Sequence, residues 1–395
     1  MDTYRFGFVM EQALGHRVYH RNLETWSRGD TSYEATWMSV PSWRDDRWNR
    51  LPLLNRNYSV RMSFRARDLV RARQAEGPSF DALFYHTFVS SLFNRGASRD
   101  SPVVISMDAT PLGFDALGAG YGHKADAPGL ASRLKLRWYK RLFNSAAAVT
   151  CWNRWTAESL MNDYDVEPSR ISVISPGADL DRWKPTHRDD RDNARPRLLF
   201  LGGEFERKGG RVLLDVFRSH LADRCELDIV SDEAPIESEG PIRVHRGVTH
   251  EKGGLKALFD AADVFVLPTR GDTLPLAITE AMASGLPVVS CRVGAIHEQV
   301  VEGETGLLVP PNDPAALAKA LTSLLDDPAR RREMGIAGRL RTERLFNGPR
   351  NAAALMDFLK RVVDDARGRK AAPANRPIAV PIGGRRSTIR STRSS

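Results

Sequence analysis

Short apolar segments alternate with amphipathic segments along most of the chain, and this alternation constrains the fold more than any other feature. A first series of apolar segments consists of FGFVM (6–10), ALFYHT (82–87), PVVISMD (102–108), AAAVTCW (146–152) and ISVISPG (171–177). A second series consists of RLLFLGG (197–203), CELDIVS (225–231), IRVHRGV (242–248), DVFVLPT (263–269), PVVSC (287–291) and GLLVP (306–310). Buried apolar strands separated by helices are typical of a parallel sheet that is covered on both faces. The sequence therefore predicts an α/β fold with two doubly wound, Rossmann-like domains.

A polar segment separates the two series. THRDDRDNARPR (186–197) is charged and directly precedes a fresh apolar strand, as a linker between domains does. We therefore expect four parts, which are a first domain over residues 1–191, a second domain over residues 192–348, a helix over residues 349–366 and a tail over residues 367–395.

The positive charge of the chain is concentrated in its tail. The net charge is +9, and residues 367–395 hold eight basic residues and no acidic one. The rest of the chain has 50 basic and 49 acidic residues, so nucleic acid is not an expected partner of the folded body. The tail has a disordered composition. It is interpreted either as a solubilising segment or as an electrostatic tether to anionic lipid or nucleic acid.

Cysteine and histidine usage argues against a metal centre and against a disulfide framework. Cys151, Cys225 and Cys291 lie far apart, and the nine histidines show neither HxxxH nor HExxH spacing. No apolar run approaches the roughly 18 residues that a membrane-spanning helix needs. MDTYRFGFVMEQ at the start does not have the pattern of a signal peptide. The sequence therefore predicts a cytoplasmic protein without a metal.

Residues 34–66 differ from the rest of the chain because Trp37, Trp43 and Trp48 lie among arginines. Tryptophan and arginine are enriched at partner-binding surfaces and at membrane interfaces. This Trp/Arg segment is interpreted either as a long loop that its aromatic side chains pin to the core or as a surface that contacts a membrane or a partner.

A first candidate site lies in LFLGGEFERKGG (199–210), between a strand and a helix. Ligands of open α/β sheets bind beyond the carboxyl ends of the strands, so such loops are the places to search. The glycines let backbone amides approach an anion, and Lys208 adds a full positive charge at a helix start. The Walker A pattern is absent. This loop predicts a pyrophosphate site, with an ordinary glycine-rich turn as the alternative.

A second candidate site, RGDTLPLAITEAMASGLPVVS (270–290), carries two carboxylates. Thr273 and the amides of residues 274–276 would lie at a helix start, which suits phosphate. Glu280 could accept hydrogen bonds from a ribose, and Asp272 could accept them from sugar hydroxyls. The alternative is that both carboxylates stabilise the helix dipole, which explains Asp272 better than Glu280 because the effect fades within the first turn.

Three further motifs carry weaker signals. Asp108 ends a strand of the first series and either faces the same cleft or makes a local turn. Asp179 and Asp181 form a DxD pattern near the domain boundary, which is interpreted as an Asx turn. LGAGYGH (117–123) has the glycine spacing of a dinucleotide fingerprint but no strand directly before it, so it receives no role.

The stretch PTRGDTLPLAITEAMASGLPVVSCRVGAIHEQVVEGETGLLVPPND (268–313) resembles the C-terminal domain of the group 1 (family 4) glycosyltransferases, which have the GT-B fold. Their pattern is an acid, seven residues, Glu-Ala-Met-Ala-x-Gly-x-Pro-Val-Val, Gly-Gly-x-x-Glu and Gly-x-Thr-Gly-x-Leu-Val. FLGGEFERKGG, ISVISPGADLDRW and DVFVLPT also fit, so the resemblance covers most of residues 145–325. The N-terminal half fits more loosely, through MEQALGHRVYHRNL and SMDATP.

The resemblance implies two Rossmann-like domains that face a central cleft, with the acceptor on the first domain, the nucleotide-sugar donor on the second and the helix 349–366 crossing back to the first. It implies a retaining hexosyltransferase-type enzyme of polysaccharide or glycolipid biosynthesis, which moves a sugar to a hydroxyl of a glycan or lipid-linked acceptor. The nucleotide sugar is then a co-substrate, and neither a cofactor nor an obligatory metal is expected. The Trp/Arg segment and the basic tail suggest an acceptor on a membrane, such as a lipid-linked sugar, and with it a peripheral contact at the inner face of the membrane.

Carried over to this chain, the resemblance assigns roles to individual residues. Glu280 would bind the donor ribose, and Lys208 the diphosphate. Gly15, in the loop after the first strand, would close over the donor. Further donor contacts would come from Gly203, Arg207, Thr273, Leu274, Pro275 and Leu276. The expected catalytic residues are Lys208, Asp108 and Asp272.

The chain departs from the family pattern at three of these positions. The first acid of the pair is usually Glu, and here it is Asp272. An Arg usually lies five residues before the motif lysine, where this chain has Gly203, so that Arg207 would have to supply the charge. Asp108 occupies a position where many relatives carry His. These departures leave open a GT-B-like protein that binds a nucleotide sugar without transfer, or a non-transferase GT-B enzyme such as an epimerase.

Overall fold

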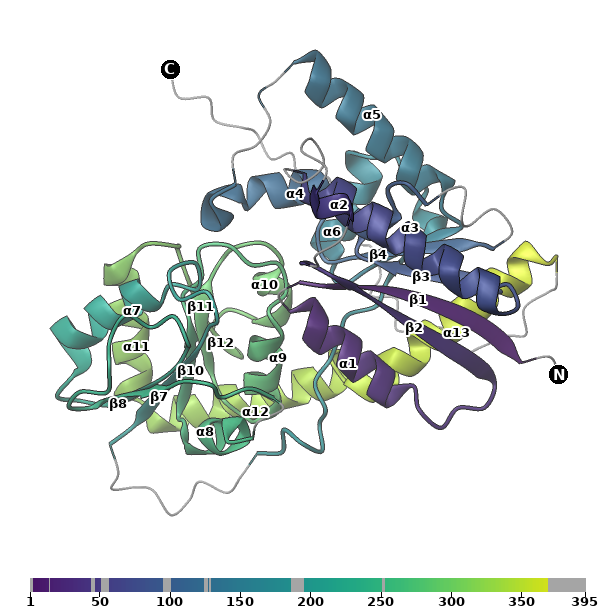
Figure 1. Ribbon diagram of the computed structural model, residues 1–395. Coiled ribbons are helices and arrows are strands. Elements are labelled where there is room, and N and C mark those ends of the chain that lie inside the picture. Colours follow the sequence, from purple (N-terminus) through teal and green to yellow (C-terminus); the bar gives the residue numbers. More distant parts are fainter. Residues whose placement is uncertain are drawn as a thin grey trace.

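Two parallel six-stranded sheets, one from each series of apolar segments, form the two halves of the molecule (Figure 1). The computed structural model describes residues 3–13, 15–43, 47–50, 57–94, 101–123, 127, 129–185, 195–250 and 253–368 of the 395 residues. Most of the expected linker (186–194) and most of the basic tail (369–395) lie outside these residues.

The first sheet has the strand order β2-β1-β3-β4-β5-β6, and its strands all pair in parallel. Its strands are β1 (Tyr4–Gln12), β2 (Tyr33–Pro41), β3 (Ala82–His86), β4 (Val103–Met107), β5 (Ala148–Cys151) and β6 (Ile171–Val173). Every strand predicted for the first half is present. The sequence did not predict β2.

The second sheet has the order β12-β11-β10-β7-β8-β9 and is parallel throughout. Its strands are β7 (Arg197–Leu201), β8 (Glu226–Val230), β9 (Ile242–His245), β10 (Val264–Leu267), β11 (Val288–Cys291) and β12 (Gly306–Val309). All six were predicted. The residues of β10 and β11 are completely buried, because helices cover both faces of the sheet.

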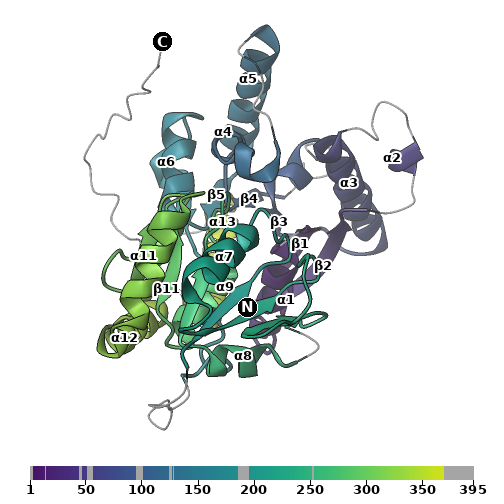
Figure 2. The ribbon, with the colours of Figure 1, turned by 90° about the vertical axis from the view of Figure 1, so that its left-hand side faces the viewer.

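Helices connect the strands and cover the sheets (Figure 2). The α-helices are α1 (His16–Trp26), α2 (Arg47–Arg50), α3 (Tyr58–Glu76), α4 (Pro111–Ala116), α5 (Leu130–Ser145), α6 (Arg154–Asn162), α7 (Gly210–Val216), α8 (Leu255–Ala261), α9 (Leu276–Ala283), α10 (Ile296–Gln299), α11 (Pro314–Leu325), α12 (Pro328–Leu345) and α13 (Gly348–Ala366). Short 3₁₀ helices span Phe88–Ser91, Gly118–Tyr121 and Pro168–Arg170, and a π-helical turn spans Phe217–Leu221.

The interpretation of residues 34–66 as a loop is wrong for the described part of that segment. Its first residues belong to β2, where Trp37 lies opposite Phe8 and stacks on it with ring centroids 4.2 Å apart. Trp48 lies on α2, stacks on Phe64 of α3 and donates a hydrogen bond to Asp68 (2.9 Å). Trp43, by contrast, is 75% exposed. Two of the three tryptophans therefore hold the fold together, which leaves Trp43 as the exposed one.

Helix α13 crosses from the second half of the molecule to the first, as the resemblance implied (Figure 1). Its apolar face, which includes Leu355 and Leu359, packs into the same cluster as Phe6 and Phe8 of β1. The hydroxyl of Tyr4 donates a hydrogen bond to Asp364 near the end of the helix (2.9 Å). The last helix of the chain is therefore part of the core of the first domain.

The chain passes between the halves twice, once after β6 and once between α12 and α13, and these two segments lie side by side. The amide of Ala178 on the outgoing segment donates to the carbonyl of Phe346 on the returning segment (2.9 Å), and the amide of Gly348 donates to the carbonyl of Ala178 (3.0 Å). At Gly177 an added Cβ would lie 2.4 Å from the backbone nitrogen of Gly348, so only glycine allows this approach. Backbone hydrogen bonds thus join the two segments that cross between the halves.

No described helix is long and apolar enough to cross a membrane.

Candidate functional site

The loop between β7 and α7 forms the tight glycine-rich turn that the sequence predicted. Gly209 has a left-handed conformation (φ +81°), and an added Cβ there would lie 2.0 Å from the carbonyl oxygen of Pro268. The loop is therefore pressed against the end of β10. This contact orients Lys208, whose backbone amide donates to the carbonyl of Glu204 (2.9 Å).

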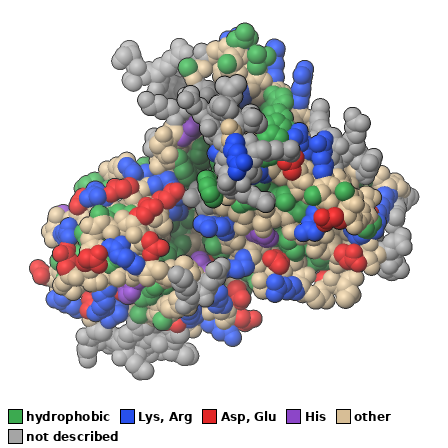
Figure 3. All heavy atoms as spheres, viewed as in Figure 1, with side chains coloured by type: hydrophobic (Ala, Val, Ile, Leu, Met, Phe, Trp, Pro, Cys, Tyr) green, Lys and Arg blue, Asp and Glu red, His purple; other side chains and the backbone are tan. Residues whose placement is uncertain are grey.

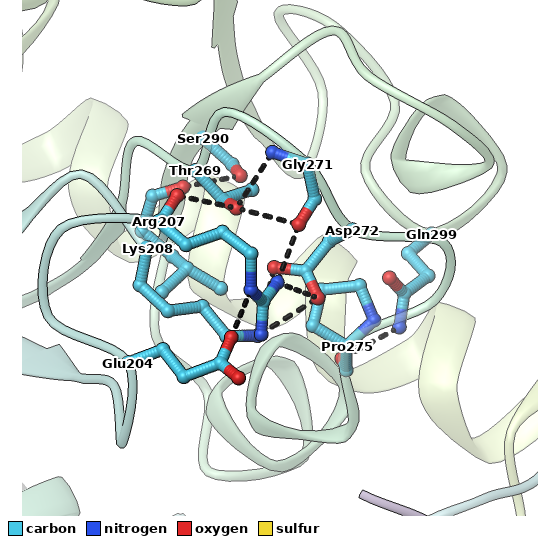
Figure 4. A network of polar contacts seen from close by, with 10 residues as sticks. Glu204, Arg207, Lys208, Thr269, Gly271, Asp272, Pro275, Ser290 and Gln299 are labelled. Atoms are coloured by element: carbon cyan, nitrogen blue, oxygen red, sulfur yellow. Dashed lines mark hydrogen bonds and ion pairs between the residues drawn. The ribbon is translucent and has the colours of Figure 1, made fainter. Parts of the chain in front are cut away.

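Lys208 and Asp272, predicted from separate motifs, form a buried ion pair (Figure 4). The ammonium of Lys208 lies 2.8 Å and 2.7 Å from the two carboxylate oxygens of Asp272. Arg207 lies on the same carboxylate, with a guanidinium nitrogen 3.3 Å from Oδ1, and also contacts Glu204. Arg207 is only 8% exposed, so its side chain points into this cluster rather than into solvent. Two cations therefore surround one carboxylate at the predicted diphosphate site.

The two cations determine the protonation state of Asp272. Burial alone would raise the pKa of this carboxyl, but Lys208 and Arg207 outweigh burial and hold the pKa below its usual value of 3.8. Burial lowers the pKa of Lys208, and the charge of Asp272 opposes that shift. The carboxylate therefore stays ionised at neutral pH and serves as the anion of the site.

The shift of Asp272 predicts how stability depends on pH. Because its pKa is depressed in the folded state, the carboxylate stabilises the fold above pH 3.8, and this contribution is lost as the pH falls through the folded-state pKa. We expect Asp272→Asn to lower the free energy of unfolding by about 1.5 kcal/mol at neutral pH. The gap should narrow as the pH falls below 3.8 and close below the depressed folded-state pKa, where the wild-type carboxyl is neutral as well. Thermal melting of both proteins from neutral to acid pH measures this, and a gap that stays constant would contradict it.

The loop of residues 273–276 leads from Asp272 into α9, which begins at Leu276, close to where the sequence placed it. Thr273 is buried, and its carbonyl accepts from the amide of Ala295 (3.0 Å). Leu274 packs into the apolar cluster of the first domain. Pro275 precedes the helix and accepts a hydrogen bond from Gln299 (3.1 Å). The loop is therefore fixed on both sides, towards α10 and towards the first domain.

Glu280 lies inside α9 and does not act as a helix cap. It is 3% exposed, and its Oε1 lies 2.7 Å from Nε2 of His250, a residue that the sequence did not single out. Its Oε2 is buried and has no hydrogen-bond partner among the described residues. A buried carboxylate oxygen without a partner is costly and therefore marks a place where a hydroxyl of a ligand can donate.

Tyr121 is a second residue of the candidate site, after His250, that the sequence missed. It belongs to LGAGYGH, which received no role, and its ring lies over the guanidinium of Arg207 at 4.4 Å from the centroid. Burial and the neighbouring Asp272 raise the pKa of its hydroxyl, so the ring stays neutral. Gly120 makes this contact possible, because an added Cβ would lie 2.6 Å from the carbonyl oxygen of Arg270. Gly120 of this segment therefore reflects a close approach between the two domains and not a dinucleotide fingerprint.

The remaining predicted residues lie around this network with fewer contacts. Asp108 follows β4, and its backbone carbonyl accepts from Asn153 and Thr156, while its side chain is close enough to Tyr121 to influence the pKa of that hydroxyl. Gly15 immediately precedes α1 and is exposed. Gly203 is exposed, and nothing lies within 4 Å of an added Cβ, so packing does not exclude the family's arginine there.

The DxD pattern is the Asx turn that the sequence predicted. The carboxylate of Asp179 accepts from the backbone amides of Asp181 and Arg182, each at 3.0 Å. Among the described residues, no cluster of histidine, cysteine and carboxylate side chains could hold a metal ion.

A cavity of about 650 Å³ lies between the domains, beyond Leu274. Glu298 on its wall joins the two halves, since its carboxylate accepts from the backbone amides of Arg154 (2.8 Å) and Trp155 (2.7 Å) at the start of α6. Neither Lys208 nor Glu280 lines this cavity. It is therefore separate from the Lys208–Asp272 cluster.

Two Rossmann-like domains with a cationic cluster at their junction define the GT-B class of fold. A family model described as "Glycosyl transferases group 1" matches residues 195–327, and one described as "Glycosyltransferase Family 4" matches residues 12–182. The D-inositol 3-phosphate glycosyltransferase of Nocardioides sp. is 30% identical over 337 residues, which cover 75% of this chain and 70% of that protein. The chain therefore belongs to the group 1 glycosyltransferases of family 4.

Other relatives match a shorter part of the chain. The D-inositol 3-phosphate glycosyltransferase of Corynebacterium glutamicum is 33% identical over 222 residues, which cover 50% of this chain and 53% of that protein. The chain thus spans about half the length of this and several other curated relatives.

Solved structures share the fold. Sucrose-phosphate synthase from Thermosynechococcus elongatus superposes with a TM-score of 0.71 at 21% identity, over 92% of this chain and 100% of that one. HepE of Anabaena, solved in complex with UDP, gives a TM-score of 0.66 at 14% identity, over 90% of this chain and 100% of that one. At such identities the likeness establishes the fold alone.

Proposed function

We propose that the protein transfers a sugar from a nucleotide-sugar donor to an acceptor hydroxyl with retention of configuration. The observation that carries this proposal is the buried cluster in which Lys208 and Arg207 surround the carboxylate of Asp272. A nucleoside diphosphate would take the place of Asp272 as the anion beside these cations, and Asp272 would then be released to accept hydrogen bonds from the sugar. The unpartnered oxygen of Glu280 would accept from the ribose.

The proposed reaction proceeds on one face of the sugar. The bond between the anomeric carbon and the phosphate oxygen breaks, and the departing diphosphate develops negative charge near Lys208, Arg207 and the amides that begin α9. The acceptor oxygen forms the new bond on the same face, and its proton passes to the departing phosphate. Asp108 and Tyr121 would lie on the acceptor side of this centre, because both belong to the first domain.

The choice of donor and acceptor for a first experiment follows from the relatives. HepE was solved with UDP-glucose, and several sequence relatives are named for D-inositol 3-phosphate. We propose a UDP-sugar as the first donor to test, against a panel that includes GDP- and ADP-sugars. The proposed acceptors are a glycan, a lipid-linked sugar and an inositol phosphate. Transfer needs no metal in this proposal, so a chelator should leave turnover unchanged. A cytoplasmic location stays a prediction of the sequence.

The test measures release of nucleoside diphosphate from each donor with and without acceptors, together with the anomeric configuration of the product by NMR. Acceptor-dependent release and an unchanged configuration support the proposal. A donor that binds without release would indicate a nucleotide-sugar-binding protein, and a donor whose sugar is epimerised would indicate an epimerase. An inverted product would overturn the retaining mechanism.

Tyr121 should affect donor binding through Arg207. A desolvated cation–π contact contributes up to about 2 kcal/mol, so we expect Tyr121→Ala to raise the donor KM about tenfold or more. Tyr121→Phe keeps the ring over the guanidinium and should leave the donor KM within about twofold of the wild type. If both variants raise the KM equally, the hydroxyl and not the ring is responsible.

A further inference from the structure

Helix α5 extends beyond the body of the first domain (Figures 1 and 2). Near its C-terminal end it packs into the core through Tyr139, Leu142 and Phe143. In the preceding part, Leu130 is 75% exposed and Leu134 is 53% exposed. Exposed leucines at the free end of a helix are unusual, since apolar side chains gain free energy when they leave water.

The exposed leucines form part of an apolar stripe. Leu130, Leu134 and Trp138 are spaced four residues apart, which places them on one face of the helix. The stripe continues into Phe93, which is 39% exposed and contacts Trp138 with ring centroids 5.4 Å apart. The apolar surface is thus continuous from the tip of the helix to the body of the domain.

A row of cations runs beside this stripe. Arg133, Arg137 and Arg141 are exposed, repeat every four residues and lie next to the leucines in the helix surface. Lys135 adds positive charge, whereas Lys140 pairs with Asp165 (2.5 Å), and the sixteen residues of α5 contain no acidic residue. Figure 3 shows hydrophobic side chains beside Lys and Arg side chains at this end of the molecule. We call the face formed by Leu130, Leu134, Trp138, Arg133, Arg137 and Arg141 the α5 surface.

We propose that the α5 surface binds the surface of an anionic lipid bilayer, with its leucines inserted among the lipids and its arginines on the headgroups. An amphipathic helix with apolar residues on one face and Lys/Arg on the other has this property. Nucleic acid would use the arginines but offers no apolar phase for Leu130 and Leu134. The location differs from the one predicted from the sequence, because Trp37 and Trp48 of the Trp/Arg segment stack inside the domain.

Helix α12 offers a matched control. Ile336 and Leu340 are also four residues apart and are 61% and 60% exposed. Two arginines of α12 contact the protein itself, since Arg339 pairs with Glu343 (2.6 Å) and Arg341 donates to the carbonyl of Gln299 (2.9 Å). Arg332 and Arg344 are exposed, and the helix also carries the acidic residues Glu333 and Glu343. The two helices therefore present similar apolar exposure, and they differ in that α12 has acidic residues among its arginines whereas α5 has none.

The experiment is co-sedimentation of the full chain with phosphatidylcholine vesicles, with and without phosphatidylglycerol, at low and high salt. We expect binding only with phosphatidylglycerol and less binding at high salt, which screens the arginines. Leu130→Ser/Leu134→Ser and Arg133→Gln/Arg137→Gln should each lower the partition coefficient at least about tenfold. Ile336→Ser/Leu340→Ser should leave it unchanged. Equal thermal midpoints would show that all variants are folded.

Other outcomes would overturn the proposal. These are binding that survives both α5 double substitutions, binding that falls equally in the α12 control, and binding that is lost only when residues 369–395 are removed. Binding to an oligonucleotide that needs the arginines but not the leucines would assign the surface to nucleic acid. The assay contains no donor sugar, so its result does not depend on whether glycosyl transfer occurs.

Discussion

Lys208→Ala is expected to lower turnover at least tenfold, which corresponds to a loss of about 1.4 kcal/mol of transition-state stabilisation. The reason is the position of the ammonium, which is buried beside Asp272 and would face the phosphate that carries the developing charge of the leaving group. Steady-state kinetics with a saturating donor measure the loss. An unchanged kcat would remove Lys208 from the mechanism.

Two further variants separate the role of the charge from its effect on stability. Lys208→Ala leaves Asp272 buried with Arg207 as its remaining cation (3.3 Å), which could itself disturb the site. Lys208→Ala/Asp272→Asn removes both charges, so it should recover the thermal midpoint without recovering turnover. Lys256→Ala is the control for loss of a lysine, because Lys256 pairs with Asp260 on α8 and lies outside the cluster. It should retain the activity of the wild type.

Gly209→Ala is expected to lower the free energy of unfolding by about 2–5 kcal/mol. A non-glycine residue in the left-handed region costs about 1–2 kcal/mol, and Gly209 has φ +81°. The new Cβ would also lie 2.0 Å from the carbonyl oxygen of Pro268, so the loop must move away from β10. Such overpacking typically costs about 1–3 kcal/mol. Urea denaturation measures the change.

Gly203 in the same loop provides the control. Nothing lies within 4 Å of a Cβ at this position, and its φ is not in the left-handed region. We expect Gly203→Ala to change the free energy of unfolding by less than about 0.5 kcal/mol. Equal losses from the two substitutions would mean that the contact with Pro268 does not hold the loop.

The sequence predicted most of the fold because the buried strands of parallel sheets are short and continuously apolar. The segments that form β10 and β11, for example, are recognisable as strands from their own residues, without knowledge of the strands with which they pair. Strand β2 was not predicted because it lies at the edge of its sheet and carries polar as well as aromatic residues. These residues form a strand by pairing with β1. Trp37 is fixed by stacking on Phe8, a contact that no local pattern reveals.

The sequence also brought out several residues of the candidate site, for a related reason, and their roles stay predictions. Lys208, Asp272 and Glu280 each stand in a recognisable strand-to-helix loop, and the structure places Lys208 and Asp272 in direct contact. Tyr121 and His250 were missed because their significance arises only from partners far away in sequence, namely Arg207 and Glu280. The available signal was the pair Gly120 and Gly271, whose backbones approach each other closely. A single sequence does not reveal that these two glycines lie side by side.

Because α13 returns to the first domain, the residues at the end of this helix are fixed to that domain. Arg367, directly after the helix, pairs with Asp81 before β3, and Tyr4 holds the last turns of the helix through Asp364. The last described residues of the chain thus belong to the domain that begins the chain, far in sequence from that domain's own strands. A fragment of the chain that ends at the linker would lack α13, which packs against the core of the first domain. The two domains are therefore not separable modules. A fusion joined after residue 368 would therefore be attached to the domain that we propose binds the acceptor.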